Sequence, residues 1–194
     1  MIRRTFFKFF LIIIALIMFQ NASAQDKSAD ATTLELIRNL YYSSVEDENE
    51  LKKLDSLIIN DFSETLSQYP PIILAYYGGV EALKAKHAFW PFNKLSYFNS
   101  SMDILEKAVK EEPDNLEIRF IRFSILDNVP GILGFSEERE IDKDEIIFLL
   151  CNKDYSKLNA KIQENIIQYM INSGRLSPGQ IDLLTKHFPE YSSK

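Results

Sequence analysis

The spacing of apolar residues constrains the fold of this chain more than any other feature. From about Asn93 onward, apolar side chains follow one another at separations of three and four positions, at Leu95, Phe98, Met102, Leu105 and Val109. Only a helix places such residues on one face, because a strand brings every second residue to the same side. The spacing therefore predicts a helix that buries one face.

The same spacing recurs along the rest of the chain after residue 31. The helices expected from it begin near Thr32, Asp47, Pro71, Asn93, Asp114, Asp142, Leu158 and Ser177. Residues 116–120 also alternate as a strand would, but Ile121 breaks the alternation and favours a helix there. We expect an all-α fold of seven or eight helices, stacked as antiparallel hairpins.

Capping residues and prolines predict where several helices begin and end. Residues 32–35, 114–117 and 177–180 each have the spacing of a capping box, in which the first and fourth side chains satisfy free backbone N–H groups. Residues 88–92 are expected to form an aromatic connector that is broken by Pro91.

Glycines predict two further local features. Gly78 and Gly79 fall inside the helix expected from Pro71, where each costs about 1 kcal/mol relative to alanine. Such a pair predicts either a close approach between helices or a kink.

Residues 128–141 contain a proline and two glycines and are expected to form the longest loop.

The first 24 residues have the layout of a secretory signal peptide. Residues 1–8 are basic, residues 9–19 are apolar and uncharged, and residues 22–24 are the small residues typical of a cleavage site. The expected organisation is a signal peptide over 1–24, a polar leader over 25–31 and a single α-helical domain over 32–194. The protein would then be periplasmic or secreted, with no membrane span after cleavage. An uncleaved anchor is the alternative.

The charge and the cysteine content exclude several classes of protein. The 194-residue chain has a formal net charge of −6, and removal of the basic signal peptide makes the chain more acidic. An acidic protein is a poor candidate for binding nucleic acid or anionic lipid. Cys151 is the only cysteine, which excludes a disulfide framework. We expect a buried, inert thiol, with a reactive or intermolecular thiol as the alternative.

Motifs for catalysis or for cofactor binding are missing from the sequence. His87 and His187 lie far apart in the sequence, each near an expected helix end, where a histidine interacts favourably with the helix dipole. Neither has the spacing of a metal-binding motif. We expect no catalytic residue, no metal and no cofactor. Any two acidic side chains can still meet in space, which leaves an acid-pair hydrolase as one alternative.

Residues 101–115 resemble the second helix and exit turn of a tetratricopeptide repeat. Ser101, Leu105, Ala108 and Pro113 stand where that family has a small residue, a large apolar residue, an alanine and a proline. Residues 76–79 are similar to the apolar-glycine core of the first helix of the repeat. The resemblance implies a tetratricopeptide-like stack of helical hairpins. The wider pattern also resembles short uncharacterised exported bacterial proteins, which implies a location and a fold but no activity.

Aromatic residues are concentrated between positions 76 and 98, and two arginines follow on the next expected helix. The candidate ligand-binding or partner-binding residues are Tyr76, Tyr77, Trp90, Phe92, Tyr97, Arg119 and Arg122. The two arginines are three positions apart and share a helix face, so they would stack on the aromatic rings if that face meets the connector. The alternative is that the rings form the core and the arginines pair with acids.

These features predict an exported, non-enzymatic helical binding or scaffold module for a protein or peptide. In this interpretation Trp90 and Tyr97 hold the partner while an arginine binds its carboxylate. One alternative is a carrier that encloses a small ligand or lipid in an aromatic pocket, and the second is the acid-pair hydrolase. Ile132, Leu133 and Phe135 of the long loop are a further candidate contact for a partner. The oligomeric state has no sequence signal.

Overall fold

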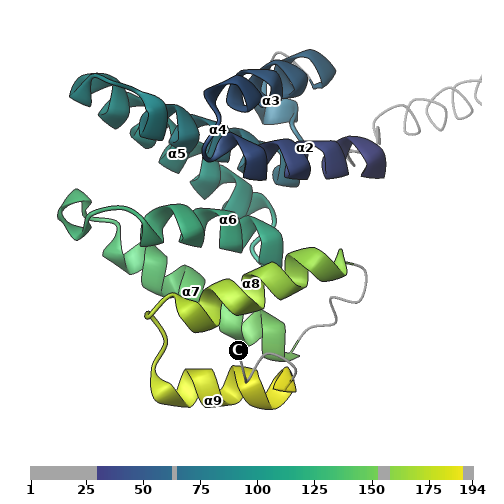
Figure 1. Ribbon diagram of the computed structural model, residues 1–194, viewed down its shortest axis with the longest axis vertical. Helices are drawn as coiled ribbons and strands as arrows, with labels where there is room; N and C mark the ends of the chain where they lie inside the picture. The colour runs from purple at the N-terminus through teal and green to yellow at the C-terminus, as the bar shows by residue number, and fades with distance from the viewer. Residues whose placement is uncertain (1–29, 63–64, 153–157, 190–194) are drawn as a thin grey trace, which may run out of the picture.

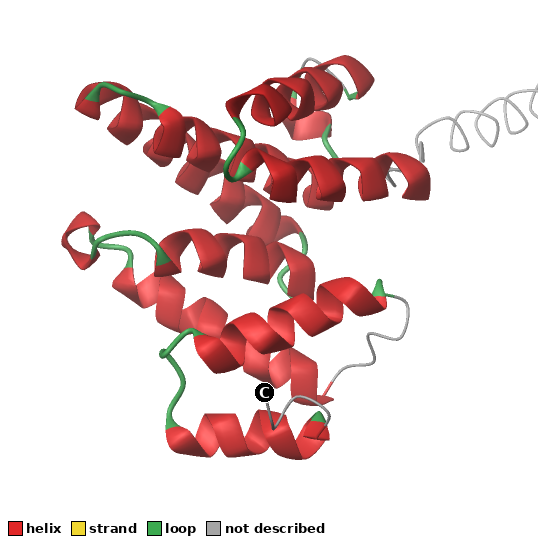
Figure 2. Cartoon of the chain, viewed as in Figure 1, coloured by secondary structure: helices red, strands yellow, loops and turns green. Residues whose placement is uncertain are grey.

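The computed structural model describes residues 30–62, 65–152 and 158–189, and this part of the chain is helical with no strand (Figures 1 and 2). Its eight α-helices are α2 (Ala31–Ser44), α3 (Glu48–Asp61), α4 (Pro71–His87), α5 (Pro91–Glu111), α6 (Leu116–Asp127), α7 (Ser136–Asn152), α8 (Ala160–Asn172) and α9 (Pro178–His187). Two short 3-10 turns are η1 (Leu66–Gln68) and η2 (Gly131–Leu133). The predicted all-α class and number of helices are confirmed.

Successive helices pack against each other in pairs joined by short links. Helix α2 contacts α3, α4 contacts α5, and α6 contacts α7, while α9 lies against both α7 and α8. Helix α4 also contacts α2, α3 and α6, so it is the centre of the first half of the fold. Figure 1 shows α2 to α5 at one end of the molecule and α7 to α9 at the other, with α6 between them.

The hydrophobic core has two parts, and α6 contributes to both. Ile118, Ile121 and Leu126 of α6 belong to the cluster formed with α2 to α5. Leu116, Phe120 and Phe123 of α6 belong to the cluster formed with α7 to α9. The preference for a helix over a strand at residues 116–121 is therefore confirmed, and the two apolar faces of α6 join the halves of the molecule.

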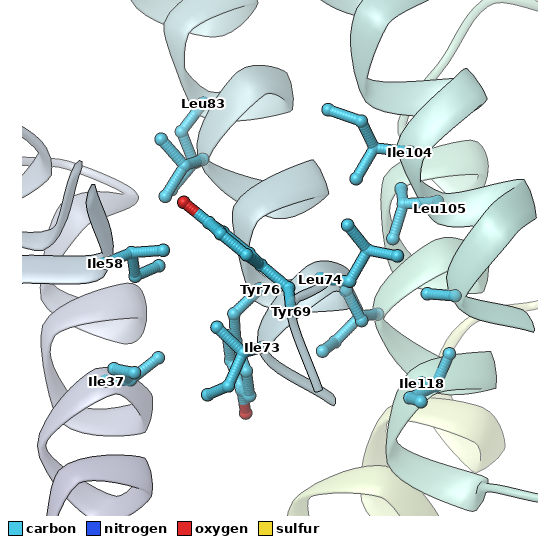
Figure 3. Packing of buried hydrophobic residues seen from close by; sticks show 14 of the residues in the cluster. Ile37, Ile58, Tyr69, Ile73, Leu74, Tyr76, Leu83, Ile104, Leu105 and Ile118 are labelled. Carbon is cyan, nitrogen blue, oxygen red and sulfur yellow. The ribbon is translucent and has the colours of Figure 1, made fainter. Parts of the chain in front are cut away.

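The first part of the core is built around α4. Figure 3 shows Ile73 of α4 near Ile37 and Ile58 on one side, while Leu74 lies toward Leu105 on the other side. All five side chains are at most 1% exposed. Burying an aliphatic side chain of this size contributes about 1.5–3 kcal/mol. Helix α4 is apolar around most of its surface because other helices cover it on several sides.

Gly78 and Gly79 allow α4 to contact two helices at once. A β-carbon at Gly78 would lie 2.7 Å from Cγ of Leu105 in α5, and one at Gly79 would lie 2.6 Å from Cε2 of Tyr41 in α2. Neither separation is accessible to packed carbon atoms. The Ser101 hydroxyl donates a hydrogen bond to the Gly78 carbonyl oxygen at 2.7 Å. The predicted close approach between helices is confirmed.

The predicted helix starts are partly right. Ser177 and Gln180 form the expected capping box. Helix α2 begins at Ala31 without a side-chain cap, so the capping box expected over 32–35 is wrong. The cap of α6 is Asn115, whose side chain accepts hydrogen bonds from the N–H groups of residues 117 and 118. Pro91 opens α5 rather than breaking a connector, because a proline at the first helical position loses no hydrogen bond.

The loop expected over 128–141 is also shorter than predicted. Helix α7 begins at Ser136 and Asp142 lies inside it, so Asp142 does not start the helix as expected. Residues 136–140 are polar and gave no apolar spacing, but acidic residues suit a first helical turn because of the helix dipole. Gly134, with φ of 87°, provides the left-handed residue that separates η2 from α7.

None of the helices in the described part of the chain is both long enough and apolar enough to cross a bilayer. The signal peptide expected over 1–24 and most of the polar leader expected over 25–31 lie outside the described residues. Export therefore stays a prediction.

Candidate functional site

The link between α4 and α5 and the first two turns of α5 carry a group of exposed apolar side chains. Phe89, Trp90 and Phe92 are 84%, 64% and 87% exposed, and Leu95 is 48% exposed. We call these four residues the apolar tip. Every residue from 91 to 97 is exposed. Isolated exposed apolar residues are common, but a contiguous group of them marks an interaction site.

The apolar tip projects because α5 begins before its packing does. Trp90 has an extended backbone and Pro91 starts the helix directly after it. Burial along α5 begins at Phe98, whose ring meets the ring of Phe135 edge to face at 5.3 Å. The turns before Phe98 therefore extend past the packed body, and the α4–α5 link forms the upper left extremity of the molecule in Figure 1.

The apolar tip lies in a part of the sequence that has no carboxylate. Residues 82–102 contain neither Asp nor Glu, although the whole chain has a net charge of −6. The Lys86 amino group donates to Glu46 Oε1 at 2.7 Å, so an acid from the α2–α3 link compensates its charge. The Lys94 amino group donates to the Lys86 carbonyl oxygen at 3.1 Å. Lys94 therefore leaves the apolar tip weakly positive.

A pocket of about 300 Å³ lies beside the apolar tip, between α3 and the α4–α5 link. Phe89 and Tyr97 contribute aromatic rings to its lining, while Glu48, Lys52, Asp55 and Lys84 contribute charges. Trp90 and Phe92 do not line it and remain on the outer side of the tip. The pocket therefore combines apolar walls with groups that can form hydrogen bonds.

Lys84 is a fixed cation in this pocket. Its amino group donates to Asp55 Oδ1 at 2.9 Å and to Glu81 Oε1 at 2.8 Å, and lies 5.7 Å from the centre of the Tyr77 ring. Burial opposes its charge, but the hydrogen bonds to Glu81 and Asp55 outweigh burial and raise the pKa of Lys84. The lysine therefore stays protonated at any physiological pH.

The aromatic residues predicted from the sequence are divided between the surface and the core. Trp90 and Phe92 belong to the apolar tip, and Tyr97 lines the adjoining pocket. Tyr77 is half-buried beside Lys84, whereas Tyr76 is 2% exposed inside the first part of the core. The structure thus brings three of the five predicted aromatic residues to one end of the molecule.

Arg119 and Arg122 bind an acid rather than the aromatic connector. Arg122 donates to both carboxylate oxygens of Asp142 at 2.6 and 2.7 Å, and Arg119 donates to Asp142 Oδ1 at 2.9 Å. Asp142 is fully buried. This geometry matches the interpretation in which the arginines pair with acids. Their partner lies in a segment of α7 that the sequence pattern placed at a helix start.

A second buried ion pair was missed in the sequence because its members are far apart. Glu117 accepts hydrogen bonds from Arg38 at 2.8 and 2.6 Å, across 79 positions, and from the Tyr76 hydroxyl at 2.5 Å. Burial opposes the charge of Arg38, but these contacts outweigh it and raise its pKa. The available signal was an acidic residue between apolar neighbours on a helix expected to be buried, because a buried charge needs a partner.

Glu117 also bears on the acid-pair alternative. It lines a pocket of about 430 Å³ together with Glu112 and Asp114. Both of its carboxylate oxygens already accept hydrogen bonds from Arg38 and from Tyr76. These contacts leave Glu117 little capacity to contact a substrate.

The remaining candidates from the sequence are scattered. Cys151 is a free, half-buried thiol rather than a fully buried one, and burial raises its pKa. His87 Nε2 lies 3.1 Å from the Ser44 carbonyl oxygen. Ile132 is 92% exposed, whereas Phe135 folds back onto the core. Among the residues that the structure describes, no group of three or more His, Cys, Asp or Glu side chains could hold a metal ion.

Comparison with known proteins leaves the function to be argued from this geometry. The chain matches no protein-family model, no curated protein and no solved structure. The pocket beside the apolar tip and the tip itself are therefore the features on which a functional proposal can be built.

Proposed function

We propose that this protein is an exported, non-enzymatic helical module that binds a protein or peptide in the pocket between α3 and the α4–α5 link. The observation that carries the proposal is the exposure of the two aromatic rings that line it, 84% for Phe89 and 37% for Tyr97. Aromatic rings bury a large area with few rotatable bonds, so they dominate protein-binding surfaces.

The dimensions of the pocket favour one side chain or one turn of a partner. Its volume of about 300 Å³ is at the lower end of the range for ligand sites. Lys52 pairs with Glu48 at 3.1 Å, but both side chains are exposed, 69% and 59%, so a partner carboxylate can compete with Glu48 for the Lys52 amino group. In this proposal Lys52 takes the role expected of an arginine, since Asp142 holds both Arg119 and Arg122.

The order of the helices supports the architectural part of the proposal. The pairs α2–α3, α4–α5 and α6–α7 follow one another along the chain, and α2, α4 and α6 form successive contacts. This is the arrangement expected of a tetratricopeptide-like stack, in which hairpins pack side by side and present an extended surface.

The two alternatives have less support from the geometry. A carrier has to enclose its ligand, but Phe89, Trp90 and Phe92 are each at least 64% exposed. A hydrolase needs a carboxylate free to give or take a proton. In the acid-lined pocket, Glu117 is fully engaged by Arg38 and Tyr76.

Site-specific photo-crosslinking in the producing cells tests the proposal. A benzophenone amino acid replaces Tyr97 in the pocket or, as a matched control, Phe148, which is 51% exposed on α7. Illumination is expected to link Tyr97-substituted protein to a discrete partner, and the link should weaken when Phe89→Ala is added. Equal crosslinking at both positions, or none at position 97, would contradict the proposal.

A further inference from the structure

The outer side of the apolar tip does not contribute to the pocket. Trp90 and Phe92 do not line it, yet they are 64% and 87% exposed, and Leu95 beside them is 48% exposed. A helix start surrounded by apolar side chains is unfavourable in water unless something covers it. The shape and the charge of the tip indicate which kind of surface covers these side chains.

The shape of the apolar tip favours a flat, deformable surface. Residues 91–97 are all exposed, and Trp90 and Phe92 line no pocket wall, so the outer side of the tip offers no groove of its own. It also lies at one extremity of the molecule (Figure 1). A lipid interface accepts an apolar group of this kind, whereas a protein partner would need a matching groove.

The chemistry of the apolar tip is also that of an interfacial group. Trp and Phe side chains concentrate at the boundary between lipid headgroups and acyl chains, and a lysine can extend its amino group toward the headgroups. The tip has Phe89, Trp90 and Phe92 together, and Lys94 follows directly. Residues 82–102 have no carboxylate that would be repelled by an anionic bilayer or would have to be desolvated.

The acidic side chains near the apolar tip lie at its base and are engaged. Glu46 binds Lys86. In the pocket Asp55 binds Lys84, and Glu48 binds Lys52. The net charge of −6 argues against anionic lipid for the protein as a whole, but this end of the molecule is a local exception. Attraction therefore depends mainly on apolar burial and only modestly on lipid charge.

We infer that the outer side of the apolar tip inserts into the interfacial region of a lipid bilayer, with Trp90 and Phe92 as the inserted side chains and Lys94 at the headgroups. The body of the protein then stays in water and the pocket stays open beside the membrane. Trp90 and Phe92 do not line the pocket, so substitutions of these two residues test insertion independently of the proposed function.

The position of Trp90 makes the inference directly measurable, because it is the only tryptophan in the chain. The exported form of the protein is mixed with vesicles of phosphatidylethanolamine and phosphatidylglycerol, and its fluorescence is recorded. Insertion is expected to shift the emission to shorter wavelengths. Lipids brominated near the headgroup end of the acyl chains should quench it more than lipids brominated near the chain ends.

Substitutions separate insertion of the apolar tip from adsorption through another part of the surface. Phe92→Ala removes one inserted ring and should weaken vesicle binding by about tenfold, whereas Phe148→Ala on the exposed surface of α7 should not change it. Lys94→Glu should weaken binding to anionic vesicles more than to phosphatidylcholine vesicles. Circular dichroism confirms that each variant is folded.

Three results would overturn the inference. One is Trp90 emission that vesicles leave unchanged while the protein stays in the supernatant. Another is vesicle binding that survives the double substitution W90A/F92A, because another part of the chain would then be responsible. The third is a concentration-dependent dimer abolished by Phe92→Ala in the absence of lipid, which would assign the apolar tip to self-association.

Discussion

Replacing Asp142 by alanine should strongly destabilise the protein. The carboxylate is fully buried and accepts three hydrogen bonds from Arg119 and Arg122 at 2.6–2.9 Å. The side chains of those arginines are only 11% and 9% exposed. Water therefore cannot replace the lost carboxylate, and Asp142→Ala leaves two buried positive charges without their acid.

The expected loss follows from the cost of an unpaired buried charge. Removing one partner of a buried ion pair costs about 3–5 kcal/mol, mainly because the other charge stays desolvated. Domains of this size unfold with a free energy of about 5–15 kcal/mol, so a fifth or more of the stability is at stake. Arg119 keeps its bond to the Pro113 carbonyl oxygen, so Arg122 bears most of the penalty.

Urea unfolding followed by far-ultraviolet circular dichroism measures this loss. Tryptophan fluorescence is unsuitable because Trp90, the only tryptophan, is exposed at the apolar tip. Glu140→Ala is the matched control, because Glu140 is an acid on the same helix with a side chain 47% exposed, and it pairs with Arg139 and Lys143. Exposed pairs contribute about 0–1 kcal/mol, so the control should unfold almost as the natural protein does.

A second variant tests the reason for the loss. Replacing Arg119, Arg122 and Asp142 together by Met, Leu and Leu removes all three charges and keeps the volume, so it should recover most of the stability lost in Asp142→Ala. The reasoning is refuted if Asp142→Ala and Glu140→Ala lose the same free energy within about 1 kcal/mol. That result would mean that water reaches the arginines in the folded protein.

Two further predictions concern packing and pH. Gly78→Ala should lower the free energy of unfolding by up to about 2 kcal/mol in urea unfolding, because overpacking against Leu105 at 2.7 Å exceeds the gain of about 1 kcal/mol in helix propensity. Gly179→Ala is its control, has open space around it, and should be neutral or slightly stabilising; equal effects of the two would contradict the close approach. Burial and a hydrogen bond to Asp127 raise the pKa of Tyr169 to about 12, so its contribution to stability is complete below pH 10 and is lost as the pH rises from 10 toward 12. Unfolding measured over that range should show a decline that is smaller in Tyr169→Phe, and an equal decline in both proteins would refute this account.

Patterns between near neighbours in the sequence predicted the helices well. The apolar spacing of α5, the capping box at Ser177 and the two apolar faces of α6 depend on residues within one or two turns of one another. Gly78 and Gly79 predicted either a close approach between helices or a kink, and the structure has the close approach.

The sequence did not predict the first turn of α7, because residues 136–140 are polar and have no apolar spacing. The start of α7 at Ser136 was missed, and Asp142 was consequently placed at a helix end rather than in the core. The partner of Arg119 and Arg122 was therefore not visible. The ion pair between Arg38 and Glu117 was not predictable from the sequence either, because its members come together only when α2 packs near α6.

The candidate site was predicted in part for a similar reason. Trp90, Phe92 and Tyr97 are neighbours in the sequence and stay neighbours at the surface, so composition alone indicated them. Tyr76 lies on the buried face of α4 and pairs with Glu117. The pocket itself also needs Lys52 and Asp55 from α3, and only the packing of α3 on α4 brings these residues to the rings.

The two-sided burial of α6 limits how the chain can change in length. Leu116, Phe120 and Phe123 face one part of the core while Ile118, Ile121 and Leu126 face the other. One added residue would rotate the following turns by about 100° and move both sets of side chains out of register at once. The fold should therefore tolerate insertions in the α4–α5 link or beside η2. An insertion within α6 should disrupt both parts of the core, because α6 packs against each of them.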